Sequence, residues 1–127
     1  MLNRYLGLAI VVVALGSTLD TFGQEATEIY IPIGQSPGLS NKTSLIGTLE
    51  SVDPGKKIVT ISSPSGAKTV GITDRTLIWL DRSPQKQPNQ NGAIGDLQQG
   101  RKVEIKLRQG ETKAVAEWVK VQVVGVK

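Results

Sequence analysis

The side chains that most often do chemistry are scarce in this chain. It has no histidine and no cysteine, and its single methionine is Met1. This excludes a Ser-His-Asp arrangement, a thiol nucleophile, a zinc site of nitrogen and sulfur ligands, and a site for a soft metal. An enzyme would have to work through carboxylates, lysine or tyrosine. We therefore expect neither a metal nor a cofactor.

The carboxylates show no catalytic pattern. Most of them fall at predicted turns or on the polar faces of predicted strands, where ordinary solvation explains them: Glu50, Asp53, Asp74, Asp81, Asp96, Glu104, Glu111 and Glu117. No stretch carries oxygen ligands at the alternate positions that a calcium loop needs. We therefore expect that the protein is not an enzyme.

An aromatic side chain beside an arginine could form a stacking site for a sugar ring or a peptide. Trp79 lies within an apolar run, which favours a place in the core, and the same holds for Trp118. If Trp79 is instead exposed beside Arg75 or Arg82, it becomes a binding candidate. Nucleic acid is not an expected partner, because the aromatic residues do not alternate with basic residues on any predicted strand.

Residues 24–44 hold apolar side chains that have no evident partner nearby. The segment Tyr30–Ser40 mixes them with two prolines and two glycines. Proline fixes φ and lacks an N–H group, so this cannot be a central strand, and we predict an extended N-terminal arm. Its apolar residues either cover an open sheet edge of the same molecule or dock on another chain by strand addition. The candidate binding residues of the whole chain are Tyr30, Ile31, Ile33, Leu39, Arg75, Trp79 and Arg82.

Residues 1–23 have the pattern of a signal peptide. Arg4 precedes an apolar run that ends near Leu19, and Thr21 and Gly23 place small residues at a cleavage site. The run is shorter than the roughly 20 residues that a helix needs to cross a bilayer, and without cysteine no lipid can be attached to a thiol. We expect an exported protein, periplasmic or secreted, with no stable membrane anchor after cleavage. The net charge of +4 selects no class of partner.

Residues 45–127 are predicted to form one β-domain. Alternating or apolar runs predict strands at 45–52, 57–62, 67–73, 76–80, 101–108 and 113–124, with an exposed loop at 81–92 and one short helical turn at 93–97. In the strand 101–108, Val103 points to the core and Glu104 to solvent. The turn after the first strand matches type II, with Gly55 at positive φ. A bulge near Glu117 or Trp118 would reconcile the two faces of the last strand.

This set of elements predicts an all-β fold, a small OB-like closed barrel of five to six strands with one short helical turn. A β-sandwich would need more strands than the sequence offers. The predicted organisation is therefore a signal peptide at 1–23, the arm at 24–44 and the barrel at 45–127.

Several segments resemble a known family. These are Ile46–Asp53, Ile58–Ile61, Val70–Thr73 with Thr76, Asp96–Ile105 and Ala116–Val121. They look like the exported bacterial OB-like barrels that are classed as domains of unknown function, and they are distantly similar to periplasmic copper- and silver-binding barrels. The latter resemblance implies a soft-metal site of His and Met near a Trp. This chain departs from that pattern, because it has no histidine and its only methionine lies in the predicted signal peptide.

Three functions are compatible with these observations. The first is a non-catalytic exported binding or assembly module that docks on another envelope protein through the arm or a sheet edge. The second is a binder of a small ligand or a surface polysaccharide that uses an exposed aromatic residue, and the third is an enzyme. The identity of a partner and the oligomeric state do not follow from the sequence.

Overall fold

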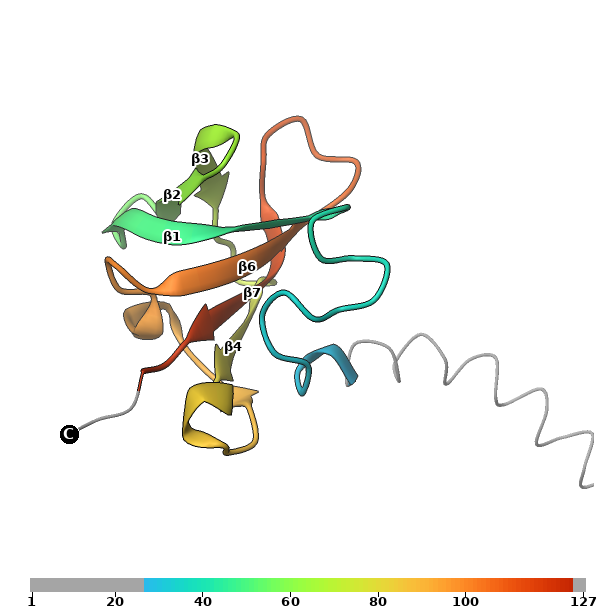
Figure 1. The fold of residues 1–127 in the computed structure, drawn as a ribbon. Helices are drawn as coiled ribbons and strands as arrows, with labels where there is room; N and C mark the ends of the chain where they lie inside the picture. The colour runs from blue at the N-terminus through green and yellow to red at the C-terminus, as the bar shows by residue number, and fades with distance from the viewer. Residues whose placement is uncertain (1–26, 125–127) are drawn as a thin grey trace, which may run out of the picture.

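The computed structural model describes residues 27–124, which form strands and short helical turns (Figure 1). The strands are β1 (Ser44–Asp53), β2 (Ile58–Ser63), β3 (Gly66–Gly71), β4 (Leu77–Asp81), β5 (Gln90–Asn91), β6 (Lys102–Leu107) and β7 (Ala116–Gln122), and two 3₁₀ helices span Ser83–Gln85 and Ile94–Asp96. The all-β prediction is confirmed. The predicted signal peptide lies outside the described residues. Within 27–124, no helix has the length and apolar character to span a membrane.

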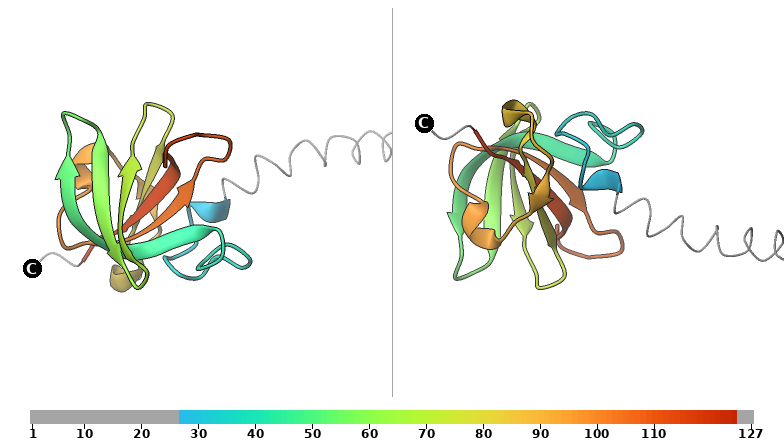
Figure 2. Two further views of the ribbon diagram at one scale, coloured as in Figure 1. Left: turned by 90° about the horizontal axis from the view of Figure 1, so that it is seen from above. Right: turned by 90° about the horizontal axis from the view of Figure 1, so that it is seen from below.

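The strands form one sheet in the order β3-β2-β1-β6-β7-β4-β5. Neighbouring strands are antiparallel, except that β4 runs parallel to β7. The sheet curls round on itself (Figure 2), and one bridge joins Gly71 at the end of β3 to Val115 just before β7. The prediction of a closed barrel of five to six strands is therefore wrong, because the sheet has seven strands and is not closed.

Two local features account for this difference. The first is the turn between β3 and β4. The end of β3 bridges to Val115 just before β7, and β4 runs parallel to β7. The Thr76 hydroxyl fixes the turn between them by donating to the carbonyl oxygen of Ala116 at 2.7 Å. The second feature lies in the predicted loop at 81–92, which folds back so that β5 pairs with Trp79 and Leu80 of β4. Short pairings of this kind leave little periodic signal in a sequence.

The hydrophobic core lies on the inward face of the curled sheet. Alternate residues of each strand point to this face, so that Val103 and Ile105 of β6 and Val119 and Val121 of β7 are completely buried. The core consists of Leu49, Val59, Ile61, Val70, Ile72, Leu97, Val103, Ile105, Ala116, Val119 and Val121. Neither Trp79 nor Trp118 belongs to this core, and both lie on the outer face of the sheet.

The connection of β1 to β2 differs from the predicted type II turn. Gly55 does not have a positive φ; Lys57 takes the left-handed conformation instead, with φ of 55°. The pair Asp53 and Ile58 closes a four-residue loop, and the Asp53 carboxylate accepts a hydrogen bond from the N–H of Lys56 at 3.0 Å. Such loops are usually built around a type I turn. The predicted bulge is confirmed, because Lys106 pairs with Trp118 and Leu107 with Ala116, which leaves Glu117 as the extra residue.

Gly47 permits β1 and β2 to lie together where β1 bends. A Cβ atom at this position would lie 2.2 Å from the carbonyl oxygen of Ser62. We expect Gly47→Ala to lower the free energy of unfolding by about 1 to 3 kcal/mol, the usual cost of overpacking, as measured by urea denaturation. Gly95→Ala is the matched control, since a Cβ atom there would meet nothing within 4 Å. Equal stabilities of the two variants would show that the close approach of Ser62 is unimportant.

The arm, which is described from Thr27, is not extended as predicted. It begins with a helical turn and continues as a series of turns up to β1. Gly34 and Gly38 have φ values of 84° and 78°, and Asn41 also takes the left-handed conformation with φ of 65°. This conformation is typical of tight turns. The arm is therefore a compact layer, seen beside β6, β7 and β4 in Figure 1.

Candidate functional site

The arm lies on the outer face of the sheet, over β4, β6 and β7. Its backbone donates two hydrogen bonds to carboxylates of the sheet: the N–H of Ile33 to Asp81 Oδ2 at 3.0 Å, and the N–H of Gly34 to Glu104 Oε1 at 2.9 Å. Ile33 is buried, with 7% of its surface exposed. Of the two alternatives for the arm, the structure therefore shows packing on the same molecule.

Glu104 is the centre of the contact between the arm and β6. Its side chain has no exposed surface. Besides Gly34, it accepts hydrogen bonds at Oε2 from the hydroxyls of Ser40 at 2.7 Å and Ser44 at 2.6 Å. A buried carboxylate requires such donors, because its desolvation is otherwise costly. The prediction that Glu104 points to solvent is wrong, since the arm covers this part of the outer face.

Lys120 of β7 is a second buried charge under the arm. Its Nζ atom lies 3.2 Å from Glu28 Oε1 and 3.3 Å from the hydroxyl of Ser36, and it sits 4.9 Å from the centre of the Trp118 ring. The Ser36 hydroxyl also donates to Glu28 at 2.7 Å. Lys120 is completely buried, so that the arm provides all the polar partners that its ammonium group has among the described residues.

Trp79 is not an exposed aromatic residue. It is only 4% exposed and stacks against Trp118, with ring centres 5.5 Å apart. Trp79 pairs with Lys120 in the parallel ladder of β4 and β7, which places it on the covered outer face. Arg75 and Arg82 lie before and after β4, at opposite ends of that strand, so they do not gather around the ring. The candidate stacking site at Trp79 is therefore not formed.

The other candidate residues of the arm differ in exposure. Tyr30 is 65% exposed, whereas Ile31 and Leu39 are half-buried. The carbonyl oxygen of Leu39 accepts hydrogen bonds from the N–H groups of Lys42, Thr43 and Ser44, which closes the turn into β1. Sequence analysis did not single out Glu28, Ser36 or Lys120 for this contact, and no local pattern marks them.

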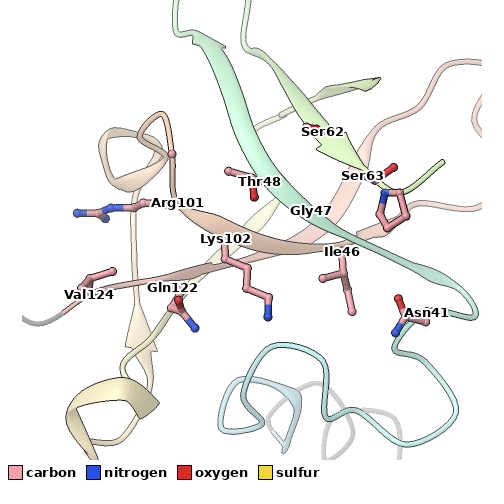
Figure 3. A pocket seen from close by; sticks show the side chains of 12 residues that line it. Asn41, Ile46, Gly47, Thr48, Ser62, Ser63, Arg101, Lys102, Gln122 and Val124 are labelled. Atoms are coloured by element: carbon pink, nitrogen blue, oxygen red, sulfur yellow. The ribbon is translucent and has the colours of Figure 1, made fainter. Parts of the chain in front are cut away.

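An open groove continues the outer face where the arm ends (Figure 3). It has a volume of about 450 Å³ and is lined by Asn41, Ile46, Gly47, Thr48, Ser62, Ser63, Pro64, Gly100, Arg101, Lys102, Gln122 and Val124. Two cations and no acidic side chain belong to this lining. Lys102 is exposed, and its Nζ atom has no hydrogen bond or ion pair within residues 27–124. Sequence analysis missed this groove, because its lining comes from distant segments.

The groove runs beside an unpaired edge of β1. The ladder of β1 with β2 begins only at Thr48, so that Ser44–Gly47 pair with β6 alone. If the ladder of β1 with β2 continued in the same register, Ile46 would lie opposite Pro64, which has no N–H group to donate. The N–H of Leu49 bonds to Arg101 of the β6 side at 2.9 Å. Since alternate residues bond to alternate sides of an antiparallel strand, the N–H and C=O groups of Ile46 point to the groove side.

A smaller cavity of about 270 Å³ lies at the other end of the sheet, between the turn before β4 and the residues around Ala93. Its charged lining residues, Lys57 and Asp74, form an exposed ion pair at 3.1 Å. Within 27–124 no three His, Cys, Asp or Glu side chains gather in a way that could hold a metal ion. The groove beside β1 is therefore the stronger candidate site.

Comparisons with known proteins give only distant matches. No family model and no curated protein matches the chain. Among solved structures, silver-bound CusF is 17% identical over 61% of this chain and 93% of its own, with a TM-score of 0.43. CusF with Ag(I) from Escherichia coli is 18% identical over 62% and 89%, with a TM-score of 0.45, and apo-CusF from Escherichia coli is 17% identical over 68% and 98%, with a TM-score of 0.44.

These structures are of the copper- and silver-binding kind that the sequence distantly resembles. At such low identity and TM-score, the likeness says nothing about the activity of this chain. The architecture described above follows from the strand pairing of this chain and does not rely on these likenesses.

Proposed function

We propose that this protein is a non-catalytic exported binding module of the bacterial envelope, which docks on another protein through the free edge of β1 beside the groove. The observation that carries this proposal is the unpaired edge of β1 at Ile46, which lies beside a groove of about 450 Å³. An unpaired strand edge can accept an added strand, in which main-chain hydrogen bonds give affinity and neighbouring pockets give specificity.

The arm is a poorer docking surface than this edge. Its apolar residue Ile33 is buried against the sheet, and its backbone donors already bond to Asp81 and Glu104. Docking through the arm would first require breaking these bonds. The free edge of β1 needs no such rearrangement, which favours it as the site of contact.

A non-catalytic role is supported by what the polar side chains do. The buried acids Glu28, Asp81 and Glu104 all accept hydrogen bonds between the arm and the sheet, that of Glu28 from Lys120, so their environment has a structural explanation. Copper or silver binding does not fit the residues present, because soft metals require thiolate, thioether or imidazole ligands. The chain has no histidine or cysteine, and Met1 is its only thioether. Export is supported by the signal-peptide pattern of residues 1–23.

Site-specific photocrosslinking tests the docking surface. A benzoylphenylalanine in place of Thr48, whose side chain lines the groove, should form an adduct with one envelope protein when the cells are illuminated. The same group in place of the exposed Tyr30 of the arm, or of Thr69 on β3, should not. Gln122→Trp, which fills the groove, should remove the adduct, whereas Lys68→Trp on the exposed surface of β3 should leave it.

Two results would contradict this proposal. An adduct formed from position 30 and not from position 48 would place the contact on the arm. The absence of an adduct from all three positions, with the protein present and folded in the envelope, would exclude stable docking on a protein through these surfaces.

A further inference from the structure

The charge of the groove limits what can dock in it. Arg101 and Lys102 are neighbours at the start of β6, and both line the groove. The guanidinium of Arg101 donates to the carbonyl oxygen of Asp96 at 3.0 Å, which holds it in place without neutralising its charge. Lys102 has no ion-pair partner within 27–124. An occupant with negative charges would neutralise both cations.

The shape and the polarity of the groove indicate an extended chain. On this edge the N–H of Ser44 already bonds to the carbonyl oxygen of Leu39 at 3.1 Å and Gly47 lies against Ser62, so Ile46 offers the free N–H and C=O groups. Of the lining residues, Ile46 belongs to this edge, whereas Gln122 and Val124 lie at and just after the end of β7, which β6 separates from β1. Successive side chains of an added strand point to opposite faces of the sheet, so acidic side chains at alternate positions would share the outer face with Lys102, and apolar side chains between them would face the core side. The lining contains no aromatic side chain on which a sugar ring or a base could stack.

Resting on the proposed docking at β1, we infer that the groove takes an extended peptide segment of a partner protein in which acidic side chains alternate with apolar ones. The segment adds to the edge of β1 at Ile46, its carboxylates lie on the outer face on the same side as Lys102, and its apolar side chains point to the opposite, core-facing side of the sheet. Electrostatic complementarity of this kind fixes the register of the added strand and excludes basic segments.

Fluorescence anisotropy with short labelled peptides tests this inference on the intact protein. An eight-residue peptide of alternating valine and glutamate should bind at least about tenfold more tightly than alternating valine and serine, and alternating valine and lysine should not bind. Lys102→Glu should weaken the glutamate peptide by about tenfold, which corresponds to roughly 1.4 kcal/mol. Lys68→Glu on the exposed face of β3 makes the same change of net charge and should have little effect.

The outcomes separate this inference from the function on which it rests. If the serine peptide binds as tightly as the glutamate peptide and Lys102→Glu has no effect, the inference that the bound segment is acidic is wrong, while docking at β1 stands. If no peptide binds but the crosslink from position 48 forms, the inference that the groove binds an extended peptide is wrong, and the partner contacts the groove through a folded surface. If heparin or an oligonucleotide binds in a manner that Lys102→Glu abolishes, and no peptide does, the groove takes an anionic polymer and the inference is overturned.

Discussion

Replacing Glu104 by alanine should lower the free energy of unfolding by about 3 to 5 kcal/mol. The completely buried carboxylate accepts hydrogen bonds from the N–H of Gly34 and from the hydroxyls of Ser40 and Ser44. Without it, the buried hydroxyl of Ser44 and the partly buried donors of Gly34 and Ser40 lose their acceptor, and a cavity opens beneath the arm. The loss is measured as the change in the free energy of unfolding in urea.

Two variants serve as comparisons for this effect. Glu50→Ala removes an exposed carboxylate from β1 and should change the stability by less than about 0.5 kcal/mol. Glu104→Gln keeps the shape of the side chain and one acceptor oxygen, so it should be less damaging than alanine. If Glu104→Ala is as mild as Glu50→Ala, the contact of the arm with β6 does not contribute to stability.

Removing the arm should have an effect of similar size. In a chain that begins at Thr43, the loss of Ile33 burial costs about 2 kcal/mol and each lost bond to Asp81 or Glu104 about 1 kcal/mol. Together they lower the melting temperature by roughly 15 to 30 °C for a domain of this size. The strands should still form, because every residue of the core cluster lies after the arm. Circular dichroism at increasing temperature measures both the sheet and its melting.

Tryptophan fluorescence reports on the same change at the face that the arm covers. Trp79 and Trp118 are the only tryptophans of the chain and are 4% and 2% exposed, so removal of the arm should shift their emission to longer wavelength. Tyr30→Ser in the full chain is the control, since Tyr30 is exposed, and it should leave both emission and melting unchanged. Unchanged emission in the shortened chain would show that the arm does not cover this face.

The strands other than β5 could be predicted because each of them carries its own periodic or apolar pattern. In β6, Val103 and Ile105 alternate with charged residues, and this pattern alone determines which face points to the core. The bulge at Glu117 followed from a change of parity within one strand. The number of strands and the closure of the sheet were predicted wrongly, because they depend on the two-residue strand β5 and on the turn before β4.

The residues under the arm could not be predicted from local patterns. Glu104 and Lys120 alternate with core residues, and an alternating charged residue normally faces water. They are buried because the arm, from a distant part of the chain, covers them with hydrogen-bonding partners. The groove beside β1 was missed for a similar reason, since Asn41, Ser63 and Lys102 meet only in the folded chain.

The ion pair between Glu28 and Lys120 joins an early part of the chain to a late one, so it can form only after nearly all of the domain has been synthesised. The two residues are 92 positions apart, and at about 5 to 20 residues per second the ribosome makes Lys120 roughly 5 to 20 s after Glu28. During this interval the arm has been made, but β7, on which it rests, has not. Docking of the arm is therefore a late step, and the nascent chain presents Tyr30, Ile31 and Ile33 to its surroundings before the sheet can cover them.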